Sequence, residues 1–171
     1  VEAMPDNTID IAFFNGAIRT SENEEMAHIL RKKAKVLIAY GACAYEGGIP
    51  ALSNLTTKEA TFNAAYIDNP TIDNENKIFP KTKTQVPEGE LTLPEFYEDA
   101  KKLKDCVDVD YYIPGCPPES EQVWNIINAI IQGAELPPKG SVIGAGESAV
   151  CDECKRTKKD MKVKRFYRPY E

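Results

Sequence analysis

The sequence contains no run of about 18 apolar residues, the length that a helix needs to cross a bilayer, so no membrane span is predicted. Its first ten residues, VEAMPDNTID, lack the basic start and the apolar core of a secretory signal peptide. We therefore expect the protein to work in the cytoplasm. An initiating methionine is also missing, which predicts a processed form or a fragment of a longer polypeptide.

Positive charge is scarce relative to negative charge. The 171 residues include 21 Lys or Arg and 27 Asp or Glu, which gives a net charge of −6. This acidity argues against a nucleic-acid-binding protein, because such a protein needs a basic face. Residues 155–168, KRTKKDMKVKRFYR, are the exception and form either a solvated tail or a docking surface for an acidic electron acceptor. An RNA-binding arm is the weaker third interpretation of this run.

Residues for acid–base or nucleophilic catalysis are scarce as well. The only histidine, His28, lies in the charged stretch EEMAHILRKK and is predicted to be an exposed helical residue. Residues 16–21, GAIRTS, do not form the Ser/Thr-rich loop that a flavin mononucleotide site requires. The sequence therefore predicts no substrate pocket in this chain.

What the sequence does contain is five cysteines, at positions 43, 106, 116, 151 and 154. Their odd number and the lack of a signal peptide fit a disulfide framework poorly. Cysteines that gather in the loops of a cytosolic protein more often bind metal or carry redox chemistry. Cys106, which precedes a predicted strand, is expected to be a structural or surface thiol instead.

The periodicity of apolar residues predicts an α/β fold with a mostly parallel sheet and helices on both faces. With 42% hydrophobic residues, the chain can bury one real core. Residues 68–93 are rich in Asn, Asp, Pro and Thr and are expected to form a long functional loop. The predicted strands are residues 9–15, 36–40 and 107–113, and the predicted helices are residues 21–33, 56–66, 93–103 and 119–132, with capping boxes at Ser21/Glu24 and Thr56/Glu59.

Two of the cysteines directly follow predicted strands. Cys43 lies in GACAYEGG and Cys116 lies in PGCPP, each beside glycine. In parallel sheets, ligands collect outside the carboxyl ends of the strands, so both thiols are expected in one crevice. Gly41 and Gly115 would let backbone N–H groups approach cluster sulfurs, and Pro117 after Cys116 is a recurrent iron–sulfur feature. A [4Fe–4S] cluster needs four thiolates, and these two loops supply two of them.

The remaining pair, Cys151 and Cys154, forms a Cys-x-x-Cys motif that can ligate one edge of a cluster or a single metal ion. Taken alone, this motif is a moderate indication of a metal or cluster site. A zinc site would need four ligands within reach, and only these two cysteines are adjacent in the sequence.

Three cysteine-containing stretches, in their order along the chain, resemble one protein family. GACAYEGGIPAL, DVDYYIPGCPP and AVCDECKRTKK are similar to segments of the small (gamma) subunit of the methyl-viologen-reducing [NiFe] hydrogenase, which works beside heterodisulfide reductase in methanogenic archaea. NGAIRTSENEEMAHILRKK and LPEFYEDAKKLKD fit the same family, so the resemblance covers nearly the whole chain. The GxCxxxG and GCPP elements are shared with a wider set that includes a respiratory complex I subunit. The Cys-Asp-Glu-Cys stretch narrows the resemblance to the archaeal hydrogenase branch.

The resemblance implies an electron-transfer subunit with a flavodoxin-like domain. In this family the domain holds a proximal [4Fe–4S] cluster close to the nickel–iron centre of the large subunit, and two of its ligands map onto Cys43 and Cys116. The other two come from a Cys-x-x-Cys after the first strand, whereas here no cysteine precedes Cys43. By the same mapping, Cys151 and Cys154 are half the ligands of a second, distal cluster. The partners implied are the large subunit, an electron-accepting iron–sulfur subunit and heterodisulfide reductase.

Residues 1–133 are accordingly expected to be the proximal-cluster domain without its first strand and Cys-x-x-Cys. Residues 134–171 are expected to be a connector and the irregular start of a second-cluster segment. Residues 47–52 and 68–93 are the candidates for contact with the large subunit, and Arg19 and Glu46 are expected near the crevice. The alternatives are a quinone-side cluster subunit built on the same domain, and a zinc-bearing or flavodoxin-like binding module without redox turnover.

Overall fold

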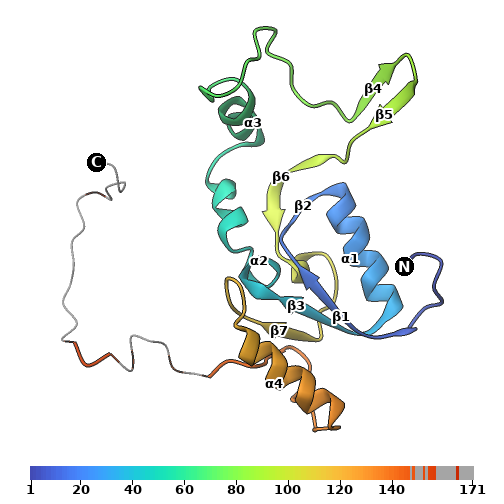
Figure 1. Cartoon of the computed structure of the whole chain (residues 1–171), viewed down its shortest axis with the longest axis vertical. Helices are drawn as coiled ribbons and strands as arrows, with labels where there is room; N and C mark the ends of the chain where they lie inside the picture. Colours follow the sequence, from blue (N-terminus) through green and yellow to red (C-terminus); the bar gives the residue numbers. More distant parts are fainter. Residues whose placement is uncertain (147, 149–151, 153, 157–164, 166–171) are drawn as a thin grey trace.

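The computed structural model describes residues 1–146, 148, 152, 154–156 and 165, and its centre is a four-stranded, fully parallel sheet (Figure 1). Strand pairing follows the order in which the strands occur in the sequence, and the fourth strand is very short. No helix in the described part of the chain is long and apolar enough to cross a membrane. The strands of this sheet are β1 (Ile9–Asn15), β3 (Ala34–Tyr40), β7 (Tyr111–Ile113) and β8 (Ser141–Val142).

Helices cover both faces of the sheet, as the sequence predicts. Leu37 and Ala39 of β3 point into a core shared with helices α1 (Ser21–Lys33) and α2 (Gly41–Glu46). Ile38, between them, belongs to a second core beneath helix α4 (Ser120–Ile131). A strand buried on both faces reads as a continuous apolar run rather than an alternating one, which explains the sequence AKVLIAY. The expected flavodoxin-like α/β architecture is therefore confirmed.

The helix caps lie one residue away from their predicted positions. The Thr20 hydroxyl accepts a hydrogen bond from the N–H of Asn23 (3.3 Å), and the Asn23 side chain accepts one from the N–H of Thr20 (3.2 Å). The sequence predicted this reciprocal box between Ser21 and Glu24. Helix α3 (Lys58–Tyr66) shows the same kind of shift, because Thr57 rather than Thr56 caps it. Where two residues with hydroxyl groups are neighbours, either can cap the helix. The cap is the one whose backbone is still extended, as it is at Thr20 and Thr57.

The prediction of a helix over residues 93–103 is wrong. This segment forms strand β6 (Phe96–Lys101), antiparallel to β2 (Ile18–Thr20), followed by the short helix η2 (Leu103–Asp105). The amide of Asn54 donates to the carbonyl of Ala100 (2.9 Å) and accepts from its N–H (2.8 Å). These long-range bonds satisfy backbone groups that a helix would have paired locally, so tertiary contacts override the apparent helical period.

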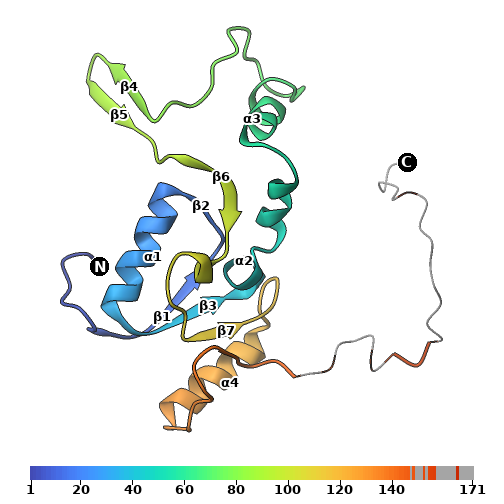
Figure 2. The ribbon, with the colours of Figure 1, turned by 180° about the vertical axis from the view of Figure 1, so that it is seen from behind.

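Residues 58–95, which we call the arm, stand out from the sheet at the end of the molecule opposite α4 (Figures 1 and 2). The arm contains α3 and an antiparallel hairpin of β4 (Lys83–Val86) and β5 (Gly89–Thr92). The loop expected over residues 68–93 is therefore partly ordered as a hairpin. The helix η1 (Ile49–Leu55) leads from α2 into the arm.

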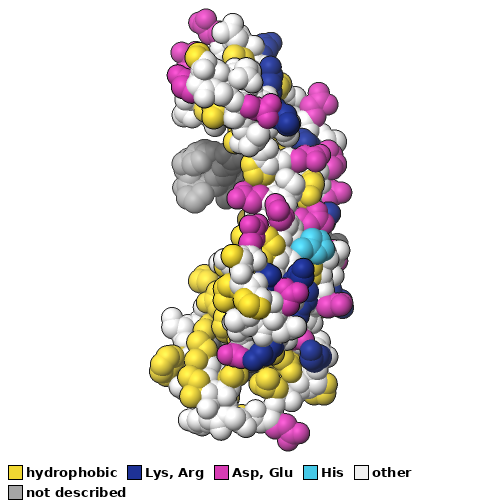
Figure 3. Space-filling model, turned by 90° about the vertical axis from the view of Figure 1, so that its right-hand side faces the viewer, with side chains coloured by type: hydrophobic (Ala, Val, Ile, Leu, Met, Phe, Trp, Pro, Cys, Tyr) yellow, Lys and Arg dark blue, Asp and Glu magenta, His cyan; other side chains and the backbone are white. Residues whose placement is uncertain are grey.

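The face of the sheet beneath α4 is only partly covered. Phe13 of β1 is 38% exposed, and Trp124 and Ile131 of α4 are 61% and 75% exposed. Figure 3 shows hydrophobic side chains gathered over this lower part of the molecule.

Strand β7 is shorter than the predicted span of 107–113, and strand β8 lies in the region expected to be a connector. The parallel pairing of β8 with β7 shows that residues 141–142 belong to the sheet. The division of the chain at residue 133 stays a prediction.

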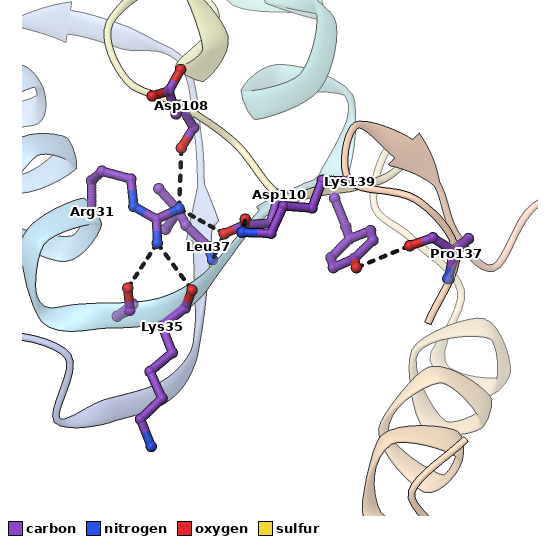
Figure 4. A network of polar contacts seen from close by, with 9 residues as sticks. Arg31, Lys35, Leu37, Asp108, Asp110, Pro137 and Lys139 are labelled. Carbon is purple, nitrogen blue, oxygen red and sulfur yellow. Dashed lines mark hydrogen bonds and ion pairs between the residues drawn. The ribbon is translucent and has the colours of Figure 1, made fainter. Parts of the chain in front are cut away.

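A buried carboxylate, Asp110, joins four segments at the amino end of the sheet (Figure 4). Its side chain forms ion pairs with Arg31 of α1 (2.6 Å) and Lys139 (2.5 Å) and accepts a hydrogen bond from the N–H of Leu37 (2.8 Å). Its own carbonyl accepts from the N–H of Gly140 (2.7 Å). Helix α1, β3, the start of β7 and the residues before β8 therefore meet at one residue that is 4% exposed.

The charge state of Asp110 follows from these contacts. Burial alone would raise the pKa of Asp110, but hydrogen bonds from Lys139, Arg31 and the Leu37 N–H, with the Arg31 charge, lower this pKa below its ordinary value. A carboxyl group whose pKa is lower in the folded state stabilises the fold above its unfolded pKa of about 3.9, and this stabilisation is lost as the pH falls through the folded pKa.

We expect Asp110→Asn to lower the free energy of unfolding by about 1.5–3 kcal/mol at neutral pH, because it removes the charge from the buried carboxylate that accepts hydrogen bonds from Arg31 and Lys139. Urea unfolding followed by circular dichroism measures this loss. The variant should also lose less stability than the parent as the pH falls below about 4. Asp108→Asn is the matched control, since Asp108 is exposed and contributes its backbone carbonyl, not its side chain, to Arg31. Equal stability of Asp110→Asn and Asp108→Asn would contradict the assignment.

Candidate functional site: two cysteine loops at the carboxyl edge of the sheet

The parallel pairing of β3 with β7 brings two cysteine loops together. Tyr40 and Ile113, the last residues of these strands, are partners in the sheet register. The chain then continues into Cys43 on one side and Cys116 on the other. The N–H of Ala42 donates a hydrogen bond to the carbonyl of Gly115 at 2.7 Å, so the residues next to the two cysteines are in direct contact. The loops meet at one edge, as predicted.

Glycine is required where the two loops touch. Gly41 has φ +83° and Gly115 has φ +132°, both in the region that disfavours side chains. A Cβ on Gly41 would lie 3.3 Å from the Gly115 carbonyl oxygen, and one on Gly115 would lie 2.5 Å from Cα of Pro118. Since these neighbours are backbone atoms, they cannot move aside cheaply. Gly41 and Gly115 therefore permit the close approach of the two loops.

A third glycine, Gly48, lines the surroundings of Cys43. A Cβ at this position would lie 3.1 Å from Sγ of Cys43 and 3.0 Å from its backbone nitrogen. The thiol thus lies against bare backbone, a setting that suits a cluster thiolate because backbone groups can come close to sulfur. The GxCxxxG motif, which consists of Gly41, Cys43 and Gly47, did not include Gly48, although the Gly-Gly pair in YEGGIP is visible in the sequence.

The prolines after Cys116 fix the second loop against the first. The peptide bond between Cys116 and Pro117 is cis, and the buried Pro118 packs against Gly41. Gln122, in the first turn of α4, donates to the carbonyl of Pro114 (3.4 Å). Cys116 itself is exposed, whereas Cys43 is half-buried in α2.

The other cysteines have different surroundings. Cys106 caps the end of η2 and packs against the core beside α1. Burial, with the nearby charge of Glu24, raises the pKa of the Cys106 thiol, which fits the predicted structural role rather than a ligand. Cys154 is exposed, and Cys151 lies outside the described residues. Their predicted role in a second cluster stays a prediction.

Arg19 holds η1, the segment that follows the Cys43 loop. Its Nη1 donates to Ser53 Oγ (2.9 Å) and Asn54 Oδ1 (3.1 Å), and its guanidinium stacks 4.6 Å from the centroid of the Phe96 ring. Glu46 is exposed at the end of α2. Both residues were expected near the crevice, but no pattern in the sequence indicated that Arg19 anchors η1.

The donor set fits half of an iron–sulfur site. Within the described ranges, no group of three or more His, Cys, Asp or Glu side chains is placed to hold a metal ion. Two thiols on adjoining, glycine-rich loops are therefore what these residues offer, and a [4Fe–4S] cluster needs two thiolates more.

The fold and this edge define a class of protein: a flavodoxin-like α/β domain with two cysteine loops at the carboxyl ends of its strands. Residues 2–130 match the family described as "NADH ubiquinone oxidoreductase, 20 Kd subunit". The chain belongs to this family.

Curated proteins with similar sequences include hydrogenase subunits. An iron–sulfur subunit of the F420-non-reducing hydrogenase of Archaeoglobus profundus is 44% identical over 91% of this chain and 48% of its own length. A subunit of the vhu F420-non-reducing hydrogenase of Methanocaldococcus jannaschii is 37% identical over 95% of this chain and 50% of its own. The chain thus spans about half the length of these relatives.

A solved structure supports the same relationship. A chain in a crystal structure of an NAD+-reducing [NiFe]-hydrogenase in the H2-reduced state superposes with a TM-score of 0.64 and 32% identity. The match covers 75% of this chain and 68% of that chain. The resemblance to hydrogenase small subunits inferred from the cysteine motifs is confirmed.

We expect Gly115→Ala to disrupt the junction of the cysteine loops while the sheet stays folded, because its Cβ would collide with the backbone of Pro117 and Pro118. The measurements are circular dichroism and, in the iron-loaded protein, the iron content per chain. Gly89→Ala is the matched control: Gly89 has a similar φ of +140°, but nothing lies within 4 Å of its Cβ position. Full iron content in Gly115→Ala, or an equal loss in both variants, would contradict this role.

Proposed function

We propose that this chain is part of the electron-transfer small subunit of a cytoplasmic [NiFe] hydrogenase. The junction of the Cys43 and Cys116 loops through Ala42 and Gly115 is the observation that carries the proposal. Its support comes from the family match, from relatives named as hydrogenase subunits, and from a similar chain in a crystal structure of an NAD+-reducing [NiFe]-hydrogenase. In this role the partner subunit would split hydrogen, and this chain would pass electrons onward.

The proximal [4Fe–4S] cluster would take Cys43 and Cys116 as two of its four ligands. When bound, such a cluster accepts and releases one electron at a time. Gly41, Gly48 and Gly115 would keep side chains away from its sulfurs, so that backbone groups tune its potential. Pro117 and Pro118 would fix the Cys116 loop in place. Cys151 and Cys154 would belong to a second, distal cluster.

The exposed side chains after Cys43 are the proposed contact with the large subunit. Ile49, Leu52 and Leu55 of η1 are 68%, 59% and 87% exposed, and they follow directly on the cysteine loop. A row of large apolar residues this exposed is typical of a protein–protein interface. The contact would shield the cluster from water and bring it close to the partner's metal centre.

The arm is the second proposed part of that interface. Ile78, Leu91 and Leu93 are each more than half exposed and line a hollow of about 500 Å³ beside Phe79. A hairpin of two strands is marginally stable by itself in water, so contact with a partner would stabilise it. Electron transfer beyond this chain, to an iron–sulfur subunit and heterodisulfide reductase, belongs to the same proposal.

The family description also favours a second candidate, a cluster subunit of a quinone reductase. That role would use the same Cys43 and Cys116 edge. It would need quinone-binding or membrane partners, so the subunits that co-purify with the protein distinguish the two candidates.

We expect Cys43→Ser and Cys116→Ser each to reduce iron and acid-labile sulfide in the anaerobically purified full-length subunit. Both variants should also lose most of a broad absorbance near about 400 nm that bleaches on reduction. Cys106→Ser is the matched control and should keep full iron, because Cys106 packs against the core beside α1. Zinc in place of iron, or undiminished iron in both variants, would refute the proposal.

A further inference from the structure

Residues 137–144, which follow α4, are anchored to the sheet. We propose that the contact of β8 with α4, centred on Gly144, is a positioning element. It makes the chain that leads to Cys154 leave the sheet at the edge where Cys43 and Cys116 lie. This inference rests on the proposed electron-transfer function and adds to it the means by which two redox sites are kept near each other.

The direction of β8 determines the edge at which the chain leaves the sheet. β8 runs parallel to β7, with Tyr111 opposite Ser141 and Tyr112 opposite Val142. The N–H of Ile143 then donates to the carbonyl of Tyr112 at 2.9 Å. Because parallel strands end at the same edge, the chain leaves β8 where β7 leads into the Cys116 loop.

Gly144 fixes the point at which the chain leaves the sheet. It has φ +76°, and a Cβ here would lie 2.5 Å from Cδ1 of Ile126 and 2.8 Å from Cγ of Gln122. Gln122 in turn donates to the carbonyl of Pro114, two residues before Cys116. The exit point therefore touches a side chain that itself touches the Cys116 loop.

The other end of β8 is held independently. Lys139 pairs with the buried Asp110 at 2.5 Å, and the N–H of Gly140 donates to the carbonyl of Asp110 at 2.7 Å. The hydroxyl of Tyr111 donates to the carbonyl of Pro137 at 3.1 Å. A strand of two residues is too short to stay paired by itself. The contacts of residues 137–140 on one side of β8 and of Ile143 and Gly144 on the other hold it in the sheet.

This anchoring shortens the tether of Cys154, which is the length of chain between Cys154 and the last residue held at the sheet. The ten residues from Gly144 to Cys154 reach about 35 Å when fully extended, whereas the 23 residues from Ile131, the end of α4, would reach about 80 Å. Because the likelihood of contact falls with tether length, a fixed Gly144 raises the effective concentration of Cys154 near the first cysteine pair. The contact of β8 with α4 thus restricts where a second redox site can lie.

The test compares Gly144→Val with Gly146→Val in the complete, cluster-loaded subunit. Valine at 144 meets Ile126 and Gln122 and is strained at positive φ, whereas nothing lies within 4 Å of the Cβ position of Gly146. We expect Gly144→Val to raise the exchange rate of the Ile143 amide roughly tenfold and to slow electron passage from the first cluster to the second by a similar factor. The iron content should stay that of the parent, and Gly146→Val should change neither rate.

Two results would overturn the proposal. One is faster amide exchange in Gly144→Val with unchanged electron passage, which would make the contact of β8 with α4 merely structural. The other is the same amide exchange in both variants, which would mean that Gly144 does not anchor β8. If Gly144→Val does not fold, Lys139→Met releases the other end of β8 and should give the same pair of changes. A parent subunit without iron would refute the proposed function, while the exchange measurement would still support or overturn the anchor.

Discussion

One backbone hydrogen bond, from the N–H of Ala42 to the carbonyl of Gly115, joins the two halves of the candidate site. It spans 2.7 Å and connects loops that are 73 residues apart in the chain. The bond can form because β3 and β7 are parallel and end in register, and because neither Gly41 nor Gly115 places a side chain between them. This contact, together with the pairing of Tyr40 with Ile113, sets the half-buried Cys43 and the exposed Cys116 on adjoining loops.

The sequence predicted the part of this arrangement that depends on local patterns and one general rule. The span of β1, the course of α4 and the ends of β3 and β7 follow from apolar runs bounded by glycine and proline. The rule that ligands collect at the carboxyl ends of parallel strands then placed Cys43 and Cys116 together. Family motifs added the function, since Gly-Cys patterns alone also fit a tight turn with an inert thiol.

The failures have one physical cause, which is that distant partners decided local structure. Residues 96–101 have a helical apolar spacing, yet pairing with β2 and the amide of Asn54 makes them a strand. Asp110 looked like an ordinary strand residue, although three donors from other segments surround its carboxylate. The sequence did not reveal β8, because a strand of two residues is too short to show an alternation of apolar and polar residues. None of these contacts has a signature within its own stretch of sequence.

The central claim is that the sulfurs of Cys43 and Cys116 are close enough to bind one centre. Phenylarsine oxide tests this directly in the metal-free protein, because its arsenic atom bonds two thiolates only when they are neighbours. Digestion and mass spectrometry should find peptides containing Cys43 and Cys116 linked through a single arsenic, with Cys106 unmodified. Arsenic bound by other cysteine pairs but never linking Cys43 to Cys116 would contradict the account.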